Sequence, residues 1–202
     1  MRAQEAYTAF YGGDLPRAVE VARHAQTLAG RTACVGVALA AALQARAHAL
    51  MGQADDAHHA LAVAESTLAA LGREDLSASA FGYSEAQFRF HEGNALTHLG
   101  DTTAAEYSHD RALELYPPED FLDRALVRLD RAACLVRAGQ VDAAATEAAD
   151  TLTDLTQQQR EGLVDLRARE ILATMTATSQ PPPAVRALHD LLTTTPGTGS
   201  ST

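Results

Sequence analysis

The residues best suited to bind a ligand form a polar stripe near the middle of the chain. Four amide and imidazole side chains follow one another at intervals of four, three and four residues, the spacing of one face of an α-helix. Such groups donate and accept hydrogen bonds, so the stripe suits a peptide backbone or a carboxylate. The alternative is a solvated helix face that binds nothing. The four residues are Gln87, His91, Asn94 and His98.

Aromatic side chains gather close to the N-terminus. Tyr7, Phe10 and Tyr11 are three of only ten aromatic residues in the chain. They lie within five positions of one another on the first expected helix. They are expected either to form an aromatic wall of a groove, or to cap the hydrophobic core or pack against a further domain.

Several arginines fall on helical segments that otherwise look apolar or are expected to face inward. Arg46 and His48 interrupt an Ala/Leu stretch, and Asp130 and Arg137 lie on a later helix. An arginine fork binds carboxylate or phosphate through two hydrogen bonds. For most of the arginines we favour the alternative, which is weak pairing with acids on adjacent turns. The acids in question are Asp123, Asp130, Glu161, Asp165 and Glu170.

Metal and catalytic chemistry are not indicated. His91 and His98 are two helical turns apart, about 10.5 Å along the axis, which is too far to share one ion. The sequence has no glycine-rich phosphate loop and no nucleophile elbow. We therefore predict no metal, no cofactor and no catalytic residue, and rank an enzyme that uses the groove below a binding protein.

Composition narrows the class of protein further. The 202 residues include 43 Ala and 16 Arg but no Lys and no Trp, and the net charge is −10. A core of alanine requires the close backbone approach that packed helices supply. The negative charge argues against direct binding of nucleic acid, which needs concentrated basic residues.

The compartment is read from what the sequence lacks. No apolar run approaches the length of a membrane span, and the N-terminus has no apolar signal core. Cys34 and Cys134 lie in apolar helical patterns, and we expect both to be buried free thiols. These features predict a cytoplasmic protein with no membrane partner.

A repeated turn organises the helices. Almost every segment has high helix propensity, and no stretch has the alternating pattern of a strand. A Gly followed by Ala five residues later recurs at spacings of 39, 48 and 39 residues, which indicates stacked helix–turn–helix units. The pairs are Gly13 with Ala18, Gly52 with Ala57, Gly100 with Ala105, and Gly139 with Ala144.

The third unit resembles a tetratricopeptide repeat (TPR). Its small residues and its terminal proline fall where that consensus places them, whereas Arg89, Glu92 and His109 replace consensus apolar or aromatic residues. In that family the first helix of each pair lines a concave binding surface, and Asn94 occupies a place where peptide-binding members often carry Asn. The matching residues are Gly93, Gly100, Ala105, Ala112 and Pro117.

A narrower resemblance covers much of residues 10–192. The segments 81–100 and 116–134 are similar to the C-terminal TPR region of actinobacterial transcriptional regulators that carry an XRE-type helix-turn-helix domain. That DNA-binding domain has no counterpart in this sequence. The resemblance implies the sensor and oligomerisation part of such a regulator, as a fragment or as a stand-alone relative.

We therefore predict an all-α protein, a TPR-like right-handed helical solenoid of about four helix pairs plus capping helices, over residues 1–192. The pairs are expected at about 1–30, 33–72, 79–118 and 120–155, with capping helices at 158–178 and 184–193 and a disordered tail at 194–202.

The expected function is binding of a peptide, a protein segment or a small effector in the concave groove. The alternative is a constitutive protein–protein scaffold, in which alanine-rich outer faces at 38–49 or 143–149 allow a homodimer. The candidate ligand-binding residues are Tyr7, Tyr11, Arg46, Gln87, Phe90, His91, Asn94, His98, Asp130 and Arg137.

Overall fold

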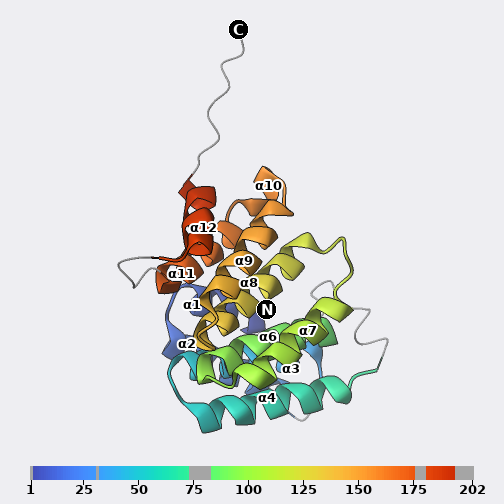
Figure 1. Cartoon of the computed structure of the whole chain (residues 1–202). Helices are drawn as coiled ribbons and strands as arrows, with labels where there is room; N and C mark the ends of the chain where they lie inside the picture. Colours follow the sequence, from blue (N-terminus) through green and yellow to red (C-terminus); the bar gives the residue numbers. More distant parts are fainter. Residues whose placement is uncertain (1, 31, 73–82, 176–180, 194–202) are drawn as a thin grey trace. The chain divides into compact units, whose positions relative to one another are not determined.

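The computed structural model describes residues 2–30, 32–72, 83–175 and 181–193. Every regular element in these ranges is an α-helix (Figure 1). The prediction of an all-α protein is therefore confirmed. The predicted tail at 194–202, residues 176–178 of a predicted capping helix and the first residues of the third predicted pair, 79–82, lie outside the described residues.

The chain divides into two compact units, Met1–Tyr116 and Pro117–Thr202, where the sequence predicts one repeat domain. In the first unit, helices α1, α3 and α6 each pack against the helix that follows them in the fold, and α3 also contacts α1 and α6. These three helices therefore lie side by side. The helices are α1 (Arg2–Tyr11), α2 (Leu15–Ala29), α3 (Val35–Leu50), α4 (Ala54–Ala69), α6 (Glu85–Leu99) and α7 (Thr102–Leu115).

The second unit has its own hydrophobic core, built mainly from Ala, Leu and Val of four helices. Helix α8 packs against α9 and α11, and α12 packs against α9 and α11. The helices are α8 (Phe121–Arg137), α9 (Val141–Thr153), α10 (Gln157–Arg160), α11 (Leu163–Met175) and α12 (Pro183–Thr193).

One predicted helix is divided in two. The segment 158–178 was expected to be continuous, but α10 ends at Arg160 and α11 begins at Leu163. Glu161 is extended, with ψ of 151°, and Gly162 has a φ of +78°. Gly162 reaches this left-handed conformation without the steric cost that a Cβ imposes, so the chain turns there.

The four predicted turn glycines all adopt positive φ, between +72° and +85°. Gly100, for example, ends α6 in the left-handed conformation, and its N–H reaches the last free carbonyls of the helix. The alanine five residues later is buried in every case, which lets the second helix of the pair approach the first closely. The pairs are Gly13 with Ala18, Gly52 with Ala57, Gly100 with Ala105, and Gly139 with Ala144.

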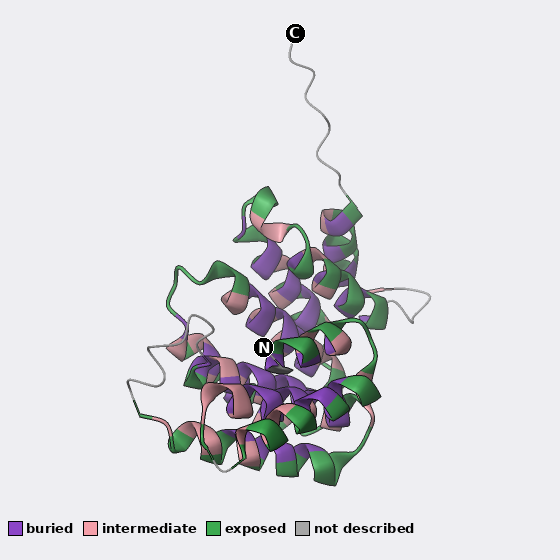
Figure 2. Cartoon of the chain, turned by 180° about the vertical axis from the view of Figure 1, so that it is seen from behind, coloured by how far each residue is buried: buried purple, intermediate pink, exposed green. Residues whose placement is uncertain are grey.

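The alanine-rich segment 38–49 is not an outer face. Its alanines are at most 3% exposed and form the centre of the first unit, because α3 is covered by α1, α2, α4 and α6. Figure 2 shows exposed residues on the outer sides of the helices and buried residues on their inner sides. In segment 143–149, Ala144, Ala145 and Ala148 are also buried. The expectation that segment 38–49 forms an outer face, available to a second copy of the chain, is therefore wrong.

The two cysteines differ in their surroundings. Both are free thiols, and Cys134 is buried as predicted. Cys34 is only partly buried, because it is the N-cap residue of α3 and lies at the end of the helix. Within the described helices, none combines the length and the apolarity that a bilayer-spanning segment requires.

Candidate functional site

The first unit brings the N-terminal aromatic residues against the polar stripe of α6. Helix α1 supplies Tyr7, Phe10 and Tyr11, which share one face because they are three and four residues apart. Helix α6 presents Phe90, His91 and Asn94 in the same spacing, and α3 supplies Arg46 between them. We call these seven residues, together with Tyr83, the inner cluster.

Arg46 is a cation held by neutral groups. The residue is buried, with only 6% of its surface exposed. Its Nε donates a hydrogen bond of 2.9 Å to Oδ1 of Asn94, which is also buried. The guanidinium carbon lies 4.5 Å from the ring centre of Phe10, 5.6 Å from Phe90 and 5.8 Å from Tyr11. These distances allow cation–π attraction to all three rings.

One nitrogen of the Arg46 guanidinium has no hydrogen-bond partner among the described residues. The buried Nη1 of Arg46 forms no hydrogen bond in the described part of the chain. The same part of the chain contains no carboxylate within ion-pair distance of Arg46. The positive charge therefore has an amide and aromatic faces around it, but no counter-ion.

His91 is bracketed by two tyrosine hydroxyls. Nε2 lies 3.0 Å from the hydroxyl of Tyr7, and Nδ1 lies 3.0 Å from the hydroxyl of Tyr83. In a neutral imidazole one nitrogen donates a hydrogen bond and the other accepts one, so one tyrosine hydroxyl is the acceptor and the other is the donor. The ring of Tyr83 also stacks on His91, with centres 5.5 Å apart. These contacts fix the imidazole in one orientation.

Burial holds Tyr83 in its neutral form. Removal from water raises the pKa of its hydroxyl well above the usual 10.0, and the nearby hydroxyls of Tyr7 and Tyr116 act in the same direction. The charge of Arg46 acts in the opposite direction but is the smaller effect. Tyr83 therefore remains a neutral hydrogen-bonding partner of His91 at neutral pH.

Six of the ten residues predicted from sequence thus lie together. For His91 and Asn94, the alternative of a solvated helix face is wrong. His91 is 2% exposed and Asn94 is 3% exposed, so the middle of the polar stripe is buried. The six are Tyr7, Tyr11, Arg46, Phe90, His91 and Asn94.

The other four predicted residues serve elsewhere or lie in the second unit. Gln87 closes the capping box of α6, with Ser84 as its partner. His98 is partly buried in the last turn of α6. Asp130 and Arg137 lie on α8 in the second unit. Asp130 is buried and forms an ion pair with Arg167, whose Nη2 lies 2.6 Å from Oδ1 of Asp130.

Tyr83 is the member of the inner cluster that sequence reasoning missed. It directly precedes Ser84, the N-cap of α6. The spacing of Ser84 and Gln87 is the signature of a capping box, and the residue before such a cap commonly packs onto the following helix. That signal was present in the sequence and predicts that Tyr83 turns inward.

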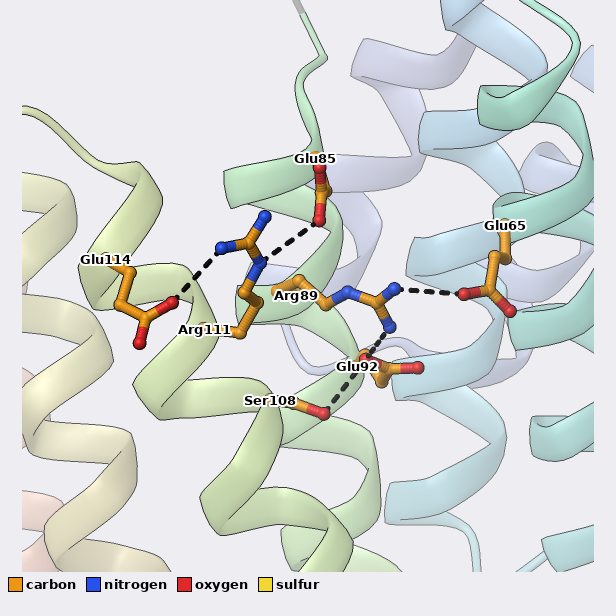
Figure 3. A network of polar contacts seen from close by, with 7 residues as sticks. All are labelled: Glu65, Glu85, Arg89, Glu92, Ser108, Arg111 and Glu114. Atoms are coloured by element: carbon orange, nitrogen blue, oxygen red, sulfur yellow. Dashed lines mark hydrogen bonds and ion pairs between the residues drawn. The ribbon is translucent and has the colours of Figure 1, made fainter.

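A second polar cluster joins α4, α6 and α7 (Figure 3). Arg89 donates to Glu65 of α4 at 3.0 Å and to Glu92 at 2.7 Å, and Ser108 of α7 also donates to Glu92 at 2.9 Å. Nearby, Arg111 pairs with Glu85 and Glu114. Because every charge drawn here has an oppositely charged partner, this cluster stabilises the packing of helices, although the buried Nε of Arg89 has no acceptor.

Four arginines of the second unit pair with carboxylates, as we favoured from sequence. Arg167 and Arg169 use acids named there, Asp130, Glu170 and Asp165, whereas Arg128 and Arg131 use others. Arg128 and Arg131 of α8 share Glu147 of α9. Arg169 pairs with Asp165 one turn away, as expected. The carboxylate of Glu147 was missed as a partner because helical spacing identifies neighbours within one helix and not those on the other helix of a pair.

The described residues contain no group of three His, Cys, Asp or Glu side chains that could hold a metal ion. The inner cluster instead combines a guanidinium, an amide, an imidazole and phenol hydroxyls. Groups of these types can form hydrogen bonds, ion pairs and stacking contacts.

Comparison of the chain with models of known protein families, with curated proteins and with solved structures found no match. Its function is therefore inferred from its own residues and their contacts.

Proposed function

We propose that the chain is a TPR-like helical-repeat module that binds a peptide, a protein segment or a small effector along α1, α3 and α6. On this proposal it serves as the sensor and oligomerisation part of a transcriptional regulator. The helix contacts of the first unit support the architecture. Each first helix packs on its own partner and on the next first helix, and α2 and α4 also contact the first helix of the following pair. Stacked repeats pack in this way.

The contact between α6 and α7 also supports a TPR-like pair. A Cβ placed on Gly93 would lie 2.4 Å from Cδ2 of His109, so only glycine lets the two helices approach this closely. Gly93 and His109 occupy the positions where the TPR consensus has a small residue and an aromatic one. The polar pair Arg89 and Glu92 departs from the consensus and joins helices by ion pairs instead of apolar packing.

The observation that carries the proposal is the inner cluster. Hydrogen bonds connect residues 84 and 48 positions apart in sequence, Tyr7 with His91 and Arg46 with Asn94. Burying so many polar groups is costly, and apolar side chains would give a more stable core. A concentration of buried polar groups on the three adjacent first helices is therefore better explained by binding than by stability.

The expected mechanism is a shift between conformations. Repeats contact only their neighbours, so small rotations between pairs add up along the array. A ligand that binds one curvature more tightly than another shifts the population towards it and changes the pose of an attached partner. Small-angle scattering with and without ligand tests this step, and superimposable profiles would rule it out.

The experiment for the proposal is native mass spectrometry and thermal shift of the purified chain after incubation with extract of its source cells. We expect a bound small molecule or peptide that raises the melting temperature. The variant Asn94→Leu removes a buried amide at similar volume and is expected to lose the ligand. Tyr107→Phe, at a tyrosine that is 68% exposed on α7, is the matched control and is expected to retain it. Failure of the wild-type chain to bind anything, or equal binding by Asn94→Leu, would contradict the proposal.

A further inference from the structure

The hydroxyl of Tyr83 determines which nitrogen of His91 carries a hydrogen. Tyr83 is only 2% exposed, so its O–H needs an acceptor inside the protein. Among the described residues, the group within hydrogen-bond distance is Nδ1 of His91, 3.0 Å away. A hydrogen on Nδ1 would leave the buried O–H of Tyr83 without an acceptor there. Nδ1 is therefore the nitrogen without a hydrogen, and it accepts the hydrogen bond from Tyr83.

The other nitrogen of His91 then carries the single hydrogen of a neutral imidazole. Its Nε2–H donates to the hydroxyl of Tyr7 on α1, which lies 3.0 Å away. The hydrogen bonds therefore run in one direction, from Tyr83 to His91 and from His91 to Tyr7. This direction holds only while the imidazole is neutral.

A second hydrogen on His91 would add a positive charge to a cluster that already holds one. His91 is 2% exposed, and burial disfavours the charged form of an imidazole. The ring of Phe90 contacts both groups, with its centre 5.4 Å from the ring centre of His91 and 5.6 Å from the guanidinium carbon of Arg46. Arg46 is surrounded by an amide and aromatic rings, which leave its charge in place.

The acids on the helices around His91 are directed to another arginine. Glu92, the next residue on α6, is bound by Arg89 and by Ser108 of α7. Glu65 of α4 also pairs with Arg89. The remaining buried titratable groups of the first unit are His48 of α3, which contacts Gln44 and Gln53, His109 of α7, which lies against Gly93, and Tyr116 at the end of α7.

We propose that His91 is an acid-sensitive switch that releases Tyr83 from the inner cluster. On acidification a proton from solvent adds to the lone pair of Nδ1, and the imidazolium then has two N–H donors. The hydrogen bond from Nε2 to Tyr7 is kept, whereas the O–H of Tyr83 loses its acceptor. The inference does not depend on the proposed function.

The switch links the folding of the first unit to pH. The folded state disfavours the second hydrogen on His91, and the unfolded chain does not. Below about pH 6.5 the unfolded chain therefore binds more protons, and the contribution of His91 to stability declines as the pH falls.

The test is long-range ¹H–¹⁵N spectroscopy of the imidazole nitrogens in the full chain, from about pH 7.5 to about pH 4.5. At the upper end we expect His91 to carry hydrogen on Nε2 and none on Nδ1. We expect half-protonation at about pH 5.5 or below, about one unit under the value of an unperturbed histidine. Amide hydrogen exchange of residues 83–88 should accelerate over the same pH range, ahead of exchange in α11 of the second unit.

Two variants connect the titration to its cause. Tyr83→Phe removes the hydrogen bond to Nδ1 and is expected to raise the pH of half-protonation of His91 by at least about half a unit. Tyr107→Phe, at a tyrosine that is 68% exposed on α7, is the matched control and should leave it unchanged.

The inference is overturned if His91 carries its hydrogen on Nδ1 at neutral pH, or if it titrates like an unperturbed histidine. It is also overturned if Tyr83→Phe and Tyr107→Phe leave the titration of His91 equally unchanged, or if exchange accelerates in both units together. Where Tyr83→Phe fails to fold, the tautomer and the titration of the wild-type chain decide the question without it.

Discussion

The imidazole of His109 fills the space where a side chain on residue 93 would begin. A Cβ at Gly93 would lie 2.4 and 2.5 Å from two atoms of this buried ring. We expect Gly93→Ala to lower the free energy of unfolding by about 1–3 kcal/mol, because the ring has no room to move away. Urea denaturation followed by circular dichroism measures the effect.

Two further variants separate the clash from the general effect of replacing glycine in a helix. Gly36 lies in the first turn of α3, where a Cβ would meet only Sγ of Cys34 at 3.9 Å. Gly36→Ala is expected to be neutral or to stabilise by about 0.4–1 kcal/mol. The double variant Gly93→Ala/His109→Ala is compared with His109→Ala. In that background, the free energy that the alanine at position 93 costs should largely disappear. A cost that persists without the ring would show that the clash is not the cause.

Tyr83 gives the protein a predictable response to alkaline pH. Because burial raises the pKa of its hydroxyl above the ordinary 10.0, the unfolded chain loses this proton first as the pH rises. The contribution of Tyr83 to stability is therefore constant below about pH 10 and declines at higher pH. Urea denaturation of wild type and Tyr83→Phe from about pH 8 to about pH 11 measures it.

Tyr83→Phe should reduce the decline in stability above about pH 10. Below about pH 10 it should also lower stability by about 1–3 kcal/mol, because Nδ1 of His91 loses a buried partner. Tyr107→Phe is the control, since Tyr107 is 68% exposed. An unchanged pH dependence in Tyr83→Phe would mean that other groups cause the alkaline decline.

Part of the inner cluster was predictable because helical spacing alone aligns His91 with Asn94 and Tyr7 with Tyr11. Arg46 was predictable because a charge in an Ala/Leu helix is rare. Their burial was not predictable, since a polar stripe reads the same whether it faces water or another helix. Neither was the hydrogen bond from Arg46 to Asn94, which depends on the register of α3 against α6.

At the scale of helices, Arg89 is the hub that joins α6 to α4. We expect Arg89→Met to lower the free energy of unfolding by about 1–3 kcal/mol, because the largely buried carboxylate of Glu92 loses its cation and keeps the hydroxyl of Ser108 as its partner in this network. Thermal and urea denaturation measure the loss. Hydrogen exchange should show it first in α4 and α6.

Arg17→Met is the matched control for this prediction. Arg17 and Glu20 form an ion pair on the surface of α2, with side chains 53% and 70% exposed, so their loss should cost less than about 0.5 kcal/mol. The double variant Arg89→Leu/Glu92→Leu should recover most of the stability that Arg89→Met loses, because the carboxylate that still lacks its partner, Glu65, is 55% exposed and no buried charge is left unpaired. An equal loss in the Arg17 and Arg89 variants would show that the network has no special weight.

Helix pairs were predictable where glycine punctuates the sequence, because each turn needs a positive φ. The break between α10 and α11 was missed even though Gly162 marks it, since the flanking residues favour helix on both sides. The helix partners of the arginines were missed for a related reason. Periodicity describes one helix at a time, whereas the carboxylates of α9 reach α8 across a turn.

At the scale of the whole chain, the net charge of −10 predicts that the chain does not bind nucleic acid by itself. Phosphate binding depends on clustered basic residues, and the arginines named here pair mostly with carboxylates. We expect no shift of duplex DNA by the purified chain in a gel assay at about 0.15 M salt. A salt-sensitive shift at micromolar protein would contradict this prediction.

The hydrogen bond between Tyr7 and His91 has a consequence for the order of folding. Neighbouring helices such as α1 and α2 can pair as soon as a short turn closes, whereas this bond must join residues 84 positions apart. During synthesis, Arg46 leaves the ribosome well before Asn94 exists to receive its hydrogen bond. The nascent chain therefore carries an exposed arginine among alanines until α6 arrives, and the inner cluster is completed late.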